Sequence, residues 1–240
     1  MQDLEFRTGV IKPVEIFKEA WELIKDQYWL IFGVTLLGLL IGGVVPIIIM
    51  GPMFCGIYLC MFERIEGREV KLDLLFKGFD FFGQSLIVSL FMTVPVIILI
   101  LTIYVPMIGM AIAGQRMKES ELLPFIIGTV ALELIVAIVM VCFHTLLMFA
   151  FPLVADRKLS GFAAIKLSAR AVWNNLSGMA GLFGVSFLVG IVGYFVLCVG
   201  VYFTLPLIFM ANAIAFRRIF PSLNKNTFGP PPPTEYQGLG

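Results

Sequence analysis

Long stretches without a charged side chain dominate this sequence. Residues 27–62, 81–115 and 171–216 contain no Asp, Glu, Lys or Arg, and residues 134–154 also lack them while carrying the chain's one histidine. A bilayer core about 30 Å thick is spanned by about 20 apolar residues in helical form. These runs therefore predict an all-α fold, a polytopic membrane helical bundle. Apolar residues make up 60% of the chain and charged residues 14%, whereas soluble proteins carry about 25% charged residues.

The lengths of the runs indicate how often the chain crosses the membrane. One helix over residues 171–216 would be about 69 Å long at ~1.5 Å per residue, so this run predicts two helices. Residues 27–62 accommodate two short helices separated at Pro46. We predict an integral membrane domain over residues 1–220 and a proline-rich cytoplasmic tail over 221–240. The six predicted spans cover about residues 29–45, 47–62, 84–113, 123–152, 176–196 and 200–216.

The distribution of cationic side chains predicts an orientation. With six spans, fifteen of the 17 Lys and Arg residues lie on one side of the membrane, and only Arg116 and Lys118 lie on the other. Loops rich in Lys and Arg stay in the cytoplasm. We therefore expect a multi-pass protein of the bacterial inner (cytoplasmic) membrane, with both termini cytoplasmic.

A short amphipathic segment precedes each predicted pair of spans. The first carries Val14, Phe17, Trp21 and Ile24 at helical spacing, the second covers 72–86, and the third begins at Ser160. Such segments are typical of interfacial helices, which lie in the headgroup region, so we expect three of them. They either anchor the bundle in the membrane or bind a cytoplasmic partner or anionic lipid. The candidate lipid or partner contacts are Trp21, Phe76, Phe79, Lys166, Arg170 and Trp173.

Glu133 and His144 are candidate intramembrane polar residues. They are eleven residues apart, so they face the same way along a helix, about 16 Å apart. Ionisable groups within a bilayer often belong to a proton or ion path. The alternative for Glu133 is a solvated position at the outer interface, because the run around it is longer than a bilayer core. The alternative for His144 is an interhelical hydrogen bond without a role in transport.

Small residues at a spacing of four predict close contacts between helices. Gly38 and Gly42 have this spacing in the first span, and Ala180 and Gly184 have it in the fifth. Small side chains let helix backbones approach in lipid, where the hydrophobic effect does not drive association. These residues pack either within the chain or against another subunit.

Motifs that carry enzymatic chemistry are missing from the sequence. It contains no HExxH, no glycine-rich phosphate loop and no Ser/His/Asp arrangement. The four cysteines lie in apolar runs without CxxC spacing, so we expect no metal and no cofactor. Nucleic-acid binding is not expected either, because the cationic residues are mixed with acidic ones along a membrane surface.

Several short motifs resemble a broad bacterial family of six-span membrane proteins of unknown function. They are Gly51-Pro52 with Gly56, the run Leu74–Phe79, the P-x-x-x-D pattern from Pro152 to Asp156, and Ala164–Ser168 followed by Trp173-Asn174-Asn175. That family is similar to the membrane domain attached to some glycerophosphodiester phosphodiesterases. The resemblance implies the six-span fold and brings no catalytic residues with it.

The tail and the absent catalytic motifs lead to the functional hypotheses. The tail either packs against a partner or rests on the chain's own cytoplasmic surface. It suits docking in an aromatic-lined groove, because proline restricts its backbone before binding. Its candidate docking residues are Phe228, Pro230, Pro231, Pro232, Pro233 and Tyr236. We expect a non-enzymatic inner-membrane accessory or scaffold subunit, with the lipid bilayer and other membrane-protein subunits as partners. The alternatives are a small-solute or lipid transporter and a membrane-embedded enzyme of lipid metabolism.

Overall fold

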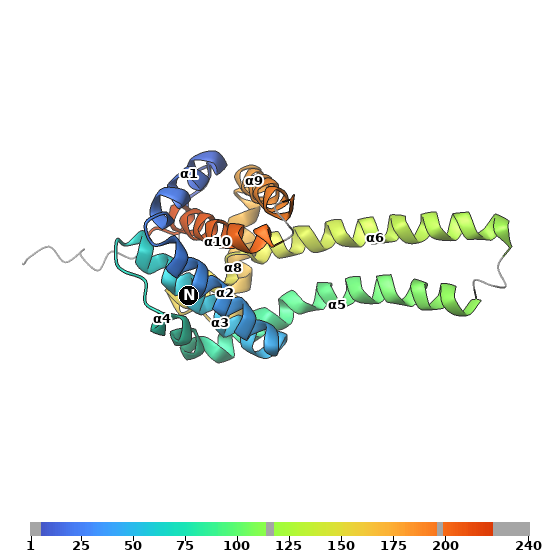
Figure 1. The fold of residues 1–240 in the computed structure, drawn as a ribbon, viewed down its shortest axis with the longest axis horizontal. Helices are drawn as coiled ribbons and strands as arrows, with labels where there is room; N and C mark the ends of the chain where they lie inside the picture. The colour runs from blue at the N-terminus through green and yellow to red at the C-terminus, as the bar shows by residue number, and fades with distance from the viewer. Residues whose placement is uncertain (1–5, 114–117, 196–198, 223–240) are drawn as a thin grey trace, which may run out of the picture.

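The protein is an all-α helical bundle. The computed structural model describes residues 6–113, 118–195 and 199–222, and within these ranges the chain forms helices and no β-strand (Figure 1). The predicted fold class is thereby confirmed. The elements are α1 (Pro13–Ile24), α2 (Tyr28–Val44), α3 (Pro46–Ile65), α4 (Asp73–Phe76), the 3-10 helix η1 (Lys77–Phe81), α5 (Phe82–Ala113), α6 (Glu119–Leu147), α7 (Ala150–Arg157), α8 (Gly161–Trp173), α9 (Leu176–Phe195) and α10 (Gly200–Ile219).

Five helical stretches in the described residues are long and apolar enough to cross a membrane, and a bent pair provides a sixth. The pair is α1 and α2, which meet at an angle of 104°. α2 alone has 17 residues, about 26 Å at ~1.5 Å per residue, which is slightly shorter than a bilayer core. The five single stretches are Pro46–Ile65, Asp73–Ile112, Ser120–Arg157, Leu176–Phe195 and Gly200–Ile219.

Local sequence explains most helix boundaries. Pro46 occupies the first turn of α3, where its missing N–H leaves no intrahelical bond unmade. Gly67 follows α3 with a φ of +75°, a left-handed conformation that glycine adopts without strain. The fourth predicted span, about residues 123–152, lies within one helical stretch, Ser120–Arg157, which has a short break between the end of α6 at Leu147 and the start of α7 at Ala150. Pro152 causes this break, since it cannot donate a hydrogen bond to the carbonyl of Met148 four residues earlier.

The interfacial segments differ in detail from the prediction. In α1 the buried side chains are Ile16, Phe17, Ala20 and Ile24, whereas Val14 and Trp21 of the predicted stripe are exposed. The reason is that α1 packs against α10 and α9 with a face that is rotated from the one predicted. The second segment is also shorter, because α4 and η1 end where α5 begins. α8 covers most of the third segment.

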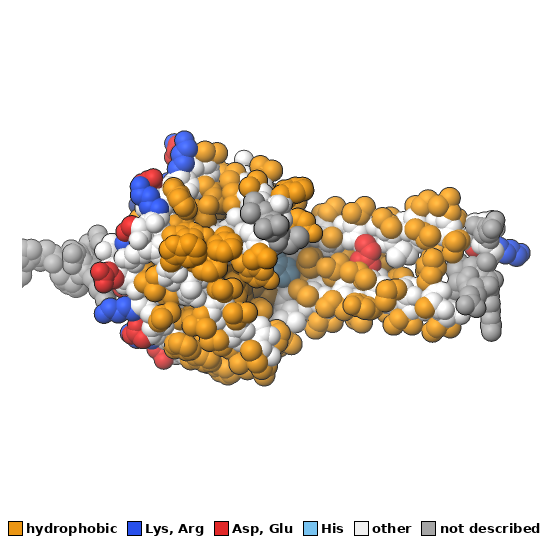
Figure 2. Space-filling model, in the orientation of Figure 1, with side chains coloured by type: hydrophobic (Ala, Val, Ile, Leu, Met, Phe, Trp, Pro, Cys, Tyr) orange, Lys and Arg blue, Asp and Glu red, His pale blue; other side chains and the backbone are white. Residues whose placement is uncertain are grey.

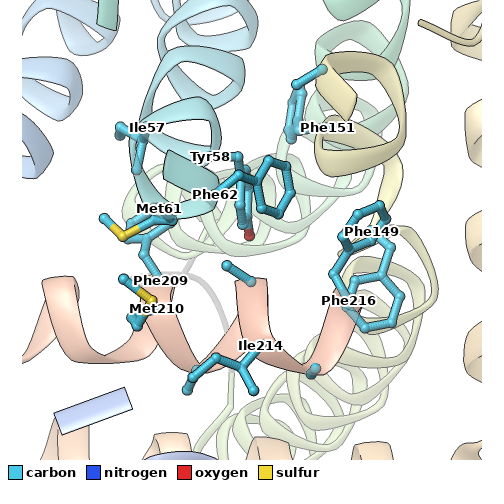
Figure 3. Packing of buried hydrophobic residues seen from close by; sticks show 14 of the residues in the cluster. Ile57, Tyr58, Met61, Phe62, Phe149, Phe151, Phe209, Met210, Ile214 and Phe216 are labelled. Carbon is cyan, nitrogen blue, oxygen red and sulfur yellow. The ribbon is translucent and has the colours of Figure 1, made fainter. Parts of the chain in front are cut away.

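A continuous aromatic core joins α3, α7 and α10 (Figure 3). The Phe54 ring of α3 stacks on Phe151 of α7 at 5.2 Å between ring centroids. Further along α3, Phe62 lies 5.3 Å from Phe216 of α10, which also contacts Phe149 at 5.9 Å. Rings in these offset and tilted arrangements contribute dispersion energy without a hydrogen-bonding requirement.

Glycines allow α3 to cross the α4–η1 segment at backbone contact. A Cβ built on Gly56 would lie 1.9 Å from the carbonyl oxygen of Leu75, and one built on Gly78 would lie 2.0 Å from that of Pro52. Any side chain at these positions would displace the backbone. Two of the motifs behind the family resemblance, the one around Gly51-Pro52 and Gly56 and the run Leu74–Phe79, therefore meet at one crossing in space.

α5 and α6 form a long hairpin that extends well beyond the other helices (Figure 1). At ~1.5 Å per residue, the 32 residues of α5 measure about 48 Å and the 29 residues of α6 about 44 Å, whereas α3, α9 and α10 each measure about 30 Å. Apolar side chains cover the hairpin along its length, and charged side chains gather at its tip and at the opposite end of the molecule (Figure 2).

Candidate functional site

Glu133 lies between the two helices of the hairpin. Its Oε2 accepts a hydrogen bond from Thr102 Oγ1 of α5 at 3.4 Å, and its Oε1 is buried without a hydrogen-bond partner. Glu133 is 21 residues from Val154, so it lies about 32 Å along the helical path from the charged end of α7. A bilayer core about 30 Å thick that begins at Val154 would end near Glu133, which faces α5.

His144 lies deeper, where the hairpin leaves the bundle. Its Nδ1 lies 2.9 Å from the carbonyl oxygen of Met140, one turn earlier in the same helix. The predicted interhelical hydrogen bond is therefore corrected to an intrahelical one. His144 lines an open apolar cavity of about 270 Å³ between α5, α6 and α9. A separate cavity of about 430 Å³ lies where η1 meets α5, next to the loop between α7 and α8. Glu133 does not line the cavity that contains His144.

A network of ion pairs, here termed the charged rim, joins four helices at the end of the molecule opposite the hairpin tip. Asp156 at the end of α7 lies 2.8 Å from Arg217 of α10, which lies 3.3 Å from Glu66 beyond α3. Arg218 lies 2.6 Å from Glu19 of α1. The rim consists of Glu15, Glu19, Glu63, Glu66, Arg68, Asp156, Arg157, Arg217 and Arg218.

The most buried members of the charged rim are arginines. The Arg157 side chain is 5% exposed, and its Nη2 donates to the carbonyl oxygens of Phe220 and Pro221. Its Nε lies 2.9 Å from Asp156 Oδ2 but has no hydrogen bond, so this contact is an ion pair only. The Arg217 guanidinium also lies 4.2 Å above the Phe62 ring, a cation–π contact. The rim thus holds the ends of α1, α3, α7 and α10 together.

Polar residues of the other motifs satisfy backbone groups. Ser168 Oγ accepts a hydrogen bond from the Phe149 N–H at 3.1 Å and donates to the Leu146 carbonyl at 2.7 Å, which bridges the break between α6 and α7. Asn175 accepts from the Gly9 N–H at 2.9 Å and donates to the Arg7 carbonyl at 3.1 Å. It therefore fixes the chain before α1 against the start of α9.

The residues predicted to contact lipid or a partner are all on the surface. Trp21 of α1 and Trp173 of α8 are 48% and 67% exposed, and the other four are exposed as well. They do not form one cluster along the chain, since they belong to α1, α4, η1 and α8. A role in contacting lipid or a partner stays a prediction for these six residues, which are Trp21, Phe76, Phe79, Lys166, Arg170 and Trp173.

The glycine pairs have different environments. Gly38 and Gly42 lie at the α2–α3 contact, where a Cβ on Gly38 would lie 2.9 Å from Ile57 Cδ1. Ala180 is exposed, and no heavy atom lies within 4 Å of a Cβ built on Gly184, so the predicted contact in α9 is corrected. The packed glycines of α9 are Gly178 and Gly181, which lie against Ile11 and Pro13 on a neighbouring face. Their spacing of three, not four, is the signal that sequence reasoning missed.

Two further polar contacts were not predicted. Thr102 was not identified as the partner of Glu133, although it is a polar residue in a long charge-free run. In the core, Tyr58 of α3 interacts with the Asn212 side chain of α10. Asn212 Oδ1 has no hydrogen-bond partner. The sequence offers one signal for this contact, which is the polar Asn212 within the uncharged run 171–216.

The predicted tail-docking residues, Phe228, Pro230, Pro231, Pro232, Pro233 and Tyr236, lie outside the described residues. Among the described residues, no group of three or more His, Cys, Asp and Glu side chains is positioned to hold a metal ion.

Comparisons with family models, with curated proteins and with solved structures found no match for this chain. The resemblance to a six-span family therefore stays a prediction. What the geometry provides is a membrane bundle with a charged rim, a polar contact in the hairpin and an apolar cavity at His144.

Proposed function

We propose that this protein is a non-enzymatic accessory or scaffold subunit of a larger assembly in the bacterial inner membrane. In this proposal, the surface that contacts other subunits is the outer hairpin, defined as residues 103–113 and 118–132. The observation that carries the proposal is the length of the hairpin relative to the rest of the bundle.

The hairpin is too long for the bilayer that fits the other helices. The segments 82–102 and 133–154 each measure about 32 Å, which already crosses a core of about 30 Å. Beyond Thr102 and Glu133, the outer hairpin adds about 16 Å of α5 and about 21 Å of α6. Hydrophobic mismatch of this size is accommodated by tilt or by association with another protein. The charged rim limits tilt, because it holds the other helices to one membrane surface.

The outer hairpin exposes large apolar side chains on both of its helices. Most side chains of α5 and α6 are at least partly exposed, whereas half of the residues of α3 are buried. A contiguous apolar surface at the membrane edge is typical of a protein interaction site. The exposed large apolar residues are Ile103, Tyr104, Val105, Met107, Ile108, Ile112, Leu123, Ile126, Ile127, Val130 and Leu132.

A contact between the segment before α1 and the end of α10 supports an even number of crossings with both termini in the cytoplasm. The Arg7 N–H donates to the Ile219 carbonyl at 2.9 Å, and the Phe6 and Phe220 rings lie 6.2 Å apart. Both contacts lie near the charged rim. The excess of Lys and Arg at this end favours the cytoplasmic side.

The transporter alternative has less support from the geometry. Glu133 and His144 would have to line one path, but Glu133 contacts Thr102 within the hairpin, whereas the cavity at His144 opens between α5, α6 and α9. For an enzyme of lipid metabolism, the described part of the chain offers no supporting arrangement of side chains.

Removal of the outer hairpin tests the proposal. Because Thr102 and Glu133 already face each other, a short Gly-Ser turn can join them in place of residues 103–132. The shortened helices still cross a bilayer, so insertion should be unchanged. We expect the full chain to purify in mild detergent in a complex with another protein, and the shortened chain to purify alone. Size-exclusion chromatography with light scattering measures both.

A matched control separates the hairpin from the tail. Deletion of residues 230–240 tests the predicted docking by the proline run, and we expect it to weaken recovery of the partner without abolishing it. Purification of the full-length chain as a monodisperse monomer, without any co-purifying protein, would contradict the proposed function.

A further inference from the structure

The cavity at His144 is a lateral opening in the membrane-spanning part of the bundle. Val96 of α5, Phe183 of α9 and four side chains of α6 or its C-terminal end line it together with His144 itself. His144 is ten residues from Val154, which is about 15 Å along the helical path and half of a bilayer core. The cavity is therefore open to lipid chains and not to the headgroups.

His144 supplies an unused hydrogen-bonding atom to this cavity. A carbonyl oxygen only accepts hydrogen bonds, so the contact with Met140 means that Nδ1 carries the proton and donates. In the neutral ring Nε2 is then an acceptor, and no side chain or backbone group in the described residues donates to it. Thr145, the other polar residue of the lining, donates to Val141 O in its own helix. An acceptor without a donor is unfavourable in hydrocarbon.

We propose that this cavity binds a lipophilic molecule that carries a hydroxyl group, an alcohol or a phenol, which enters from the bilayer and donates a hydrogen bond to His144 Nε2. The cavity matches this chemistry, because ligand sites are mostly apolar with a few placed polar groups. A hydrocarbon chain would leave Nε2 unpaired, and a charged headgroup would have to leave the membrane surface. The proposal is independent of the proposed role of the outer hairpin.

Two ligands that differ only in whether they carry a hydroxyl hydrogen-bond donor test the proposal. The full-length protein is reconstituted in phosphatidylcholine nanodiscs and labelled with a diazirine derivative of 4-nonylphenol. Unlabelled 4-nonylphenol and 4-nonylanisole, its methyl ether, then compete for the label. We expect the label to map to the lining residues by mass spectrometry, and the phenol to compete about tenfold better than the ether, the ratio for one hydrogen bond.

Two variants locate the binding. His144→Leu should reduce the preference for the phenol to less than about twofold, because Nε2 is gone. Val96→Trp should fill the cavity and abolish labelling while His144 remains, and its position at the helix surface makes it tolerant of the larger side chain. Each variant is used after it elutes as wild type does in size-exclusion chromatography.

Further competitors distinguish the sources of the hydroxyl group. A long-chain quinol and hexadecanol are compared as competitors, and the stronger one identifies the ligand class as phenol or alcohol. Equal competition by 4-nonylphenol and 4-nonylanisole in the wild-type protein would overturn the proposal. Unchanged labelling of Val96→Trp, or labels spread evenly over lipid-facing residues, would overturn it as well.

Discussion

At the scale of single residues, the positions that tolerate no change are backbone contacts. Gly56 of α3 lies against the Leu75 carbonyl, and Gly78 of η1 lies against the Pro52 carbonyl. A methyl group at either position forces the two segments apart, which costs more than the loss of any one surface contact.

Substitution of Gly56 by alanine should therefore destabilise the protein. The added Cβ would lie 1.9 Å from a backbone oxygen that cannot rotate away. We therefore expect the free energy of unfolding to fall by about 1–3 kcal/mol or more. The thermal unfolding midpoint in detergent measures it. Gly128→Ala in α6 is the matched control, because nothing lies within 4 Å of a Cβ there. Equal midpoints for the two variants would contradict the close crossing.

The ion pair between Asp26 and Arg64 should make the stability of the protein depend on pH. Arg64 donates to both carboxylate oxygens of Asp26, and this bond holds the pKa of the Asp26 carboxyl below its usual value. A lowered folded-state pKa means that the stabilisation is present above the unfolded pKa of about 3.9 and is lost as the pH falls through the folded-state value. The midpoint of wild type should exceed that of Asp26→Asn at about pH 6, and the difference should shrink below about pH 4. A difference that stays constant over this range would refute the contribution of the ion pair.

At the scale of elements, small residues matter only where helices touch. Gly38→Leu should separate α2 from α3, because its Cβ position already lies 2.9 Å from Ile57 and 3.1 Å from Leu75. Gly184→Leu should have little effect, because its Cβ position in α9 is open. We expect the free energy of unfolding to fall by at least about 2 kcal/mol for Gly38→Leu and by less than about 0.5 kcal/mol for Gly184→Leu. Thermal unfolding midpoints in detergent measure the difference. The reverse order would contradict the assignment of helix contacts.

The positions of the membrane helices follow from the sequence, whereas their contacts follow only in part. Charge-free runs and Pro46 gave span limits close to those of α2, α3, α5, α9 and α10. The facing sides were harder to predict, because side chains that face lipid are as apolar as those that face protein. The predicted α9 contact at Ala180 and Gly184 failed for this reason, and so did the interhelical bond of His144. Pro152 indicates a break before α7 from the sequence alone. The structure adds that Ser168 of α8 forms hydrogen bonds with the backbone groups left free at that break.

At the scale of the whole molecule, the charged rim and the hairpin tip define two opposite surfaces. We expect single cysteines at Lys12 and Lys71, both exposed near the rim, to be shielded from an impermeant thiol reagent in intact cells. A cysteine at Lys118, exposed at the tip, should be labelled. Permeabilised cells provide the control, because all three positions should then react. Labelling at Lys71 in intact cells would contradict the orientation.

The proposed partner follows from the relation between hairpin length and bilayer thickness. The bundle and the inner half of the hairpin match a membrane, and the outer hairpin does not. An apolar surface of this kind is stable only when lipid or protein covers it, and in our proposal protein covers the part beyond Glu133.

The most direct test is photo-crosslinking from one side chain at a time. A photoreactive residue replaces Ile127 of the outer hairpin, 59% exposed, and in a second protein it replaces Leu40 of α2, 62% exposed. We predict that Ile127 crosslinks in cells to another membrane protein, the same one that is lost when residues 103–132 are removed. The matched position Leu40 should crosslink to lipid. Crosslinks to lipid alone from both positions would contradict the account.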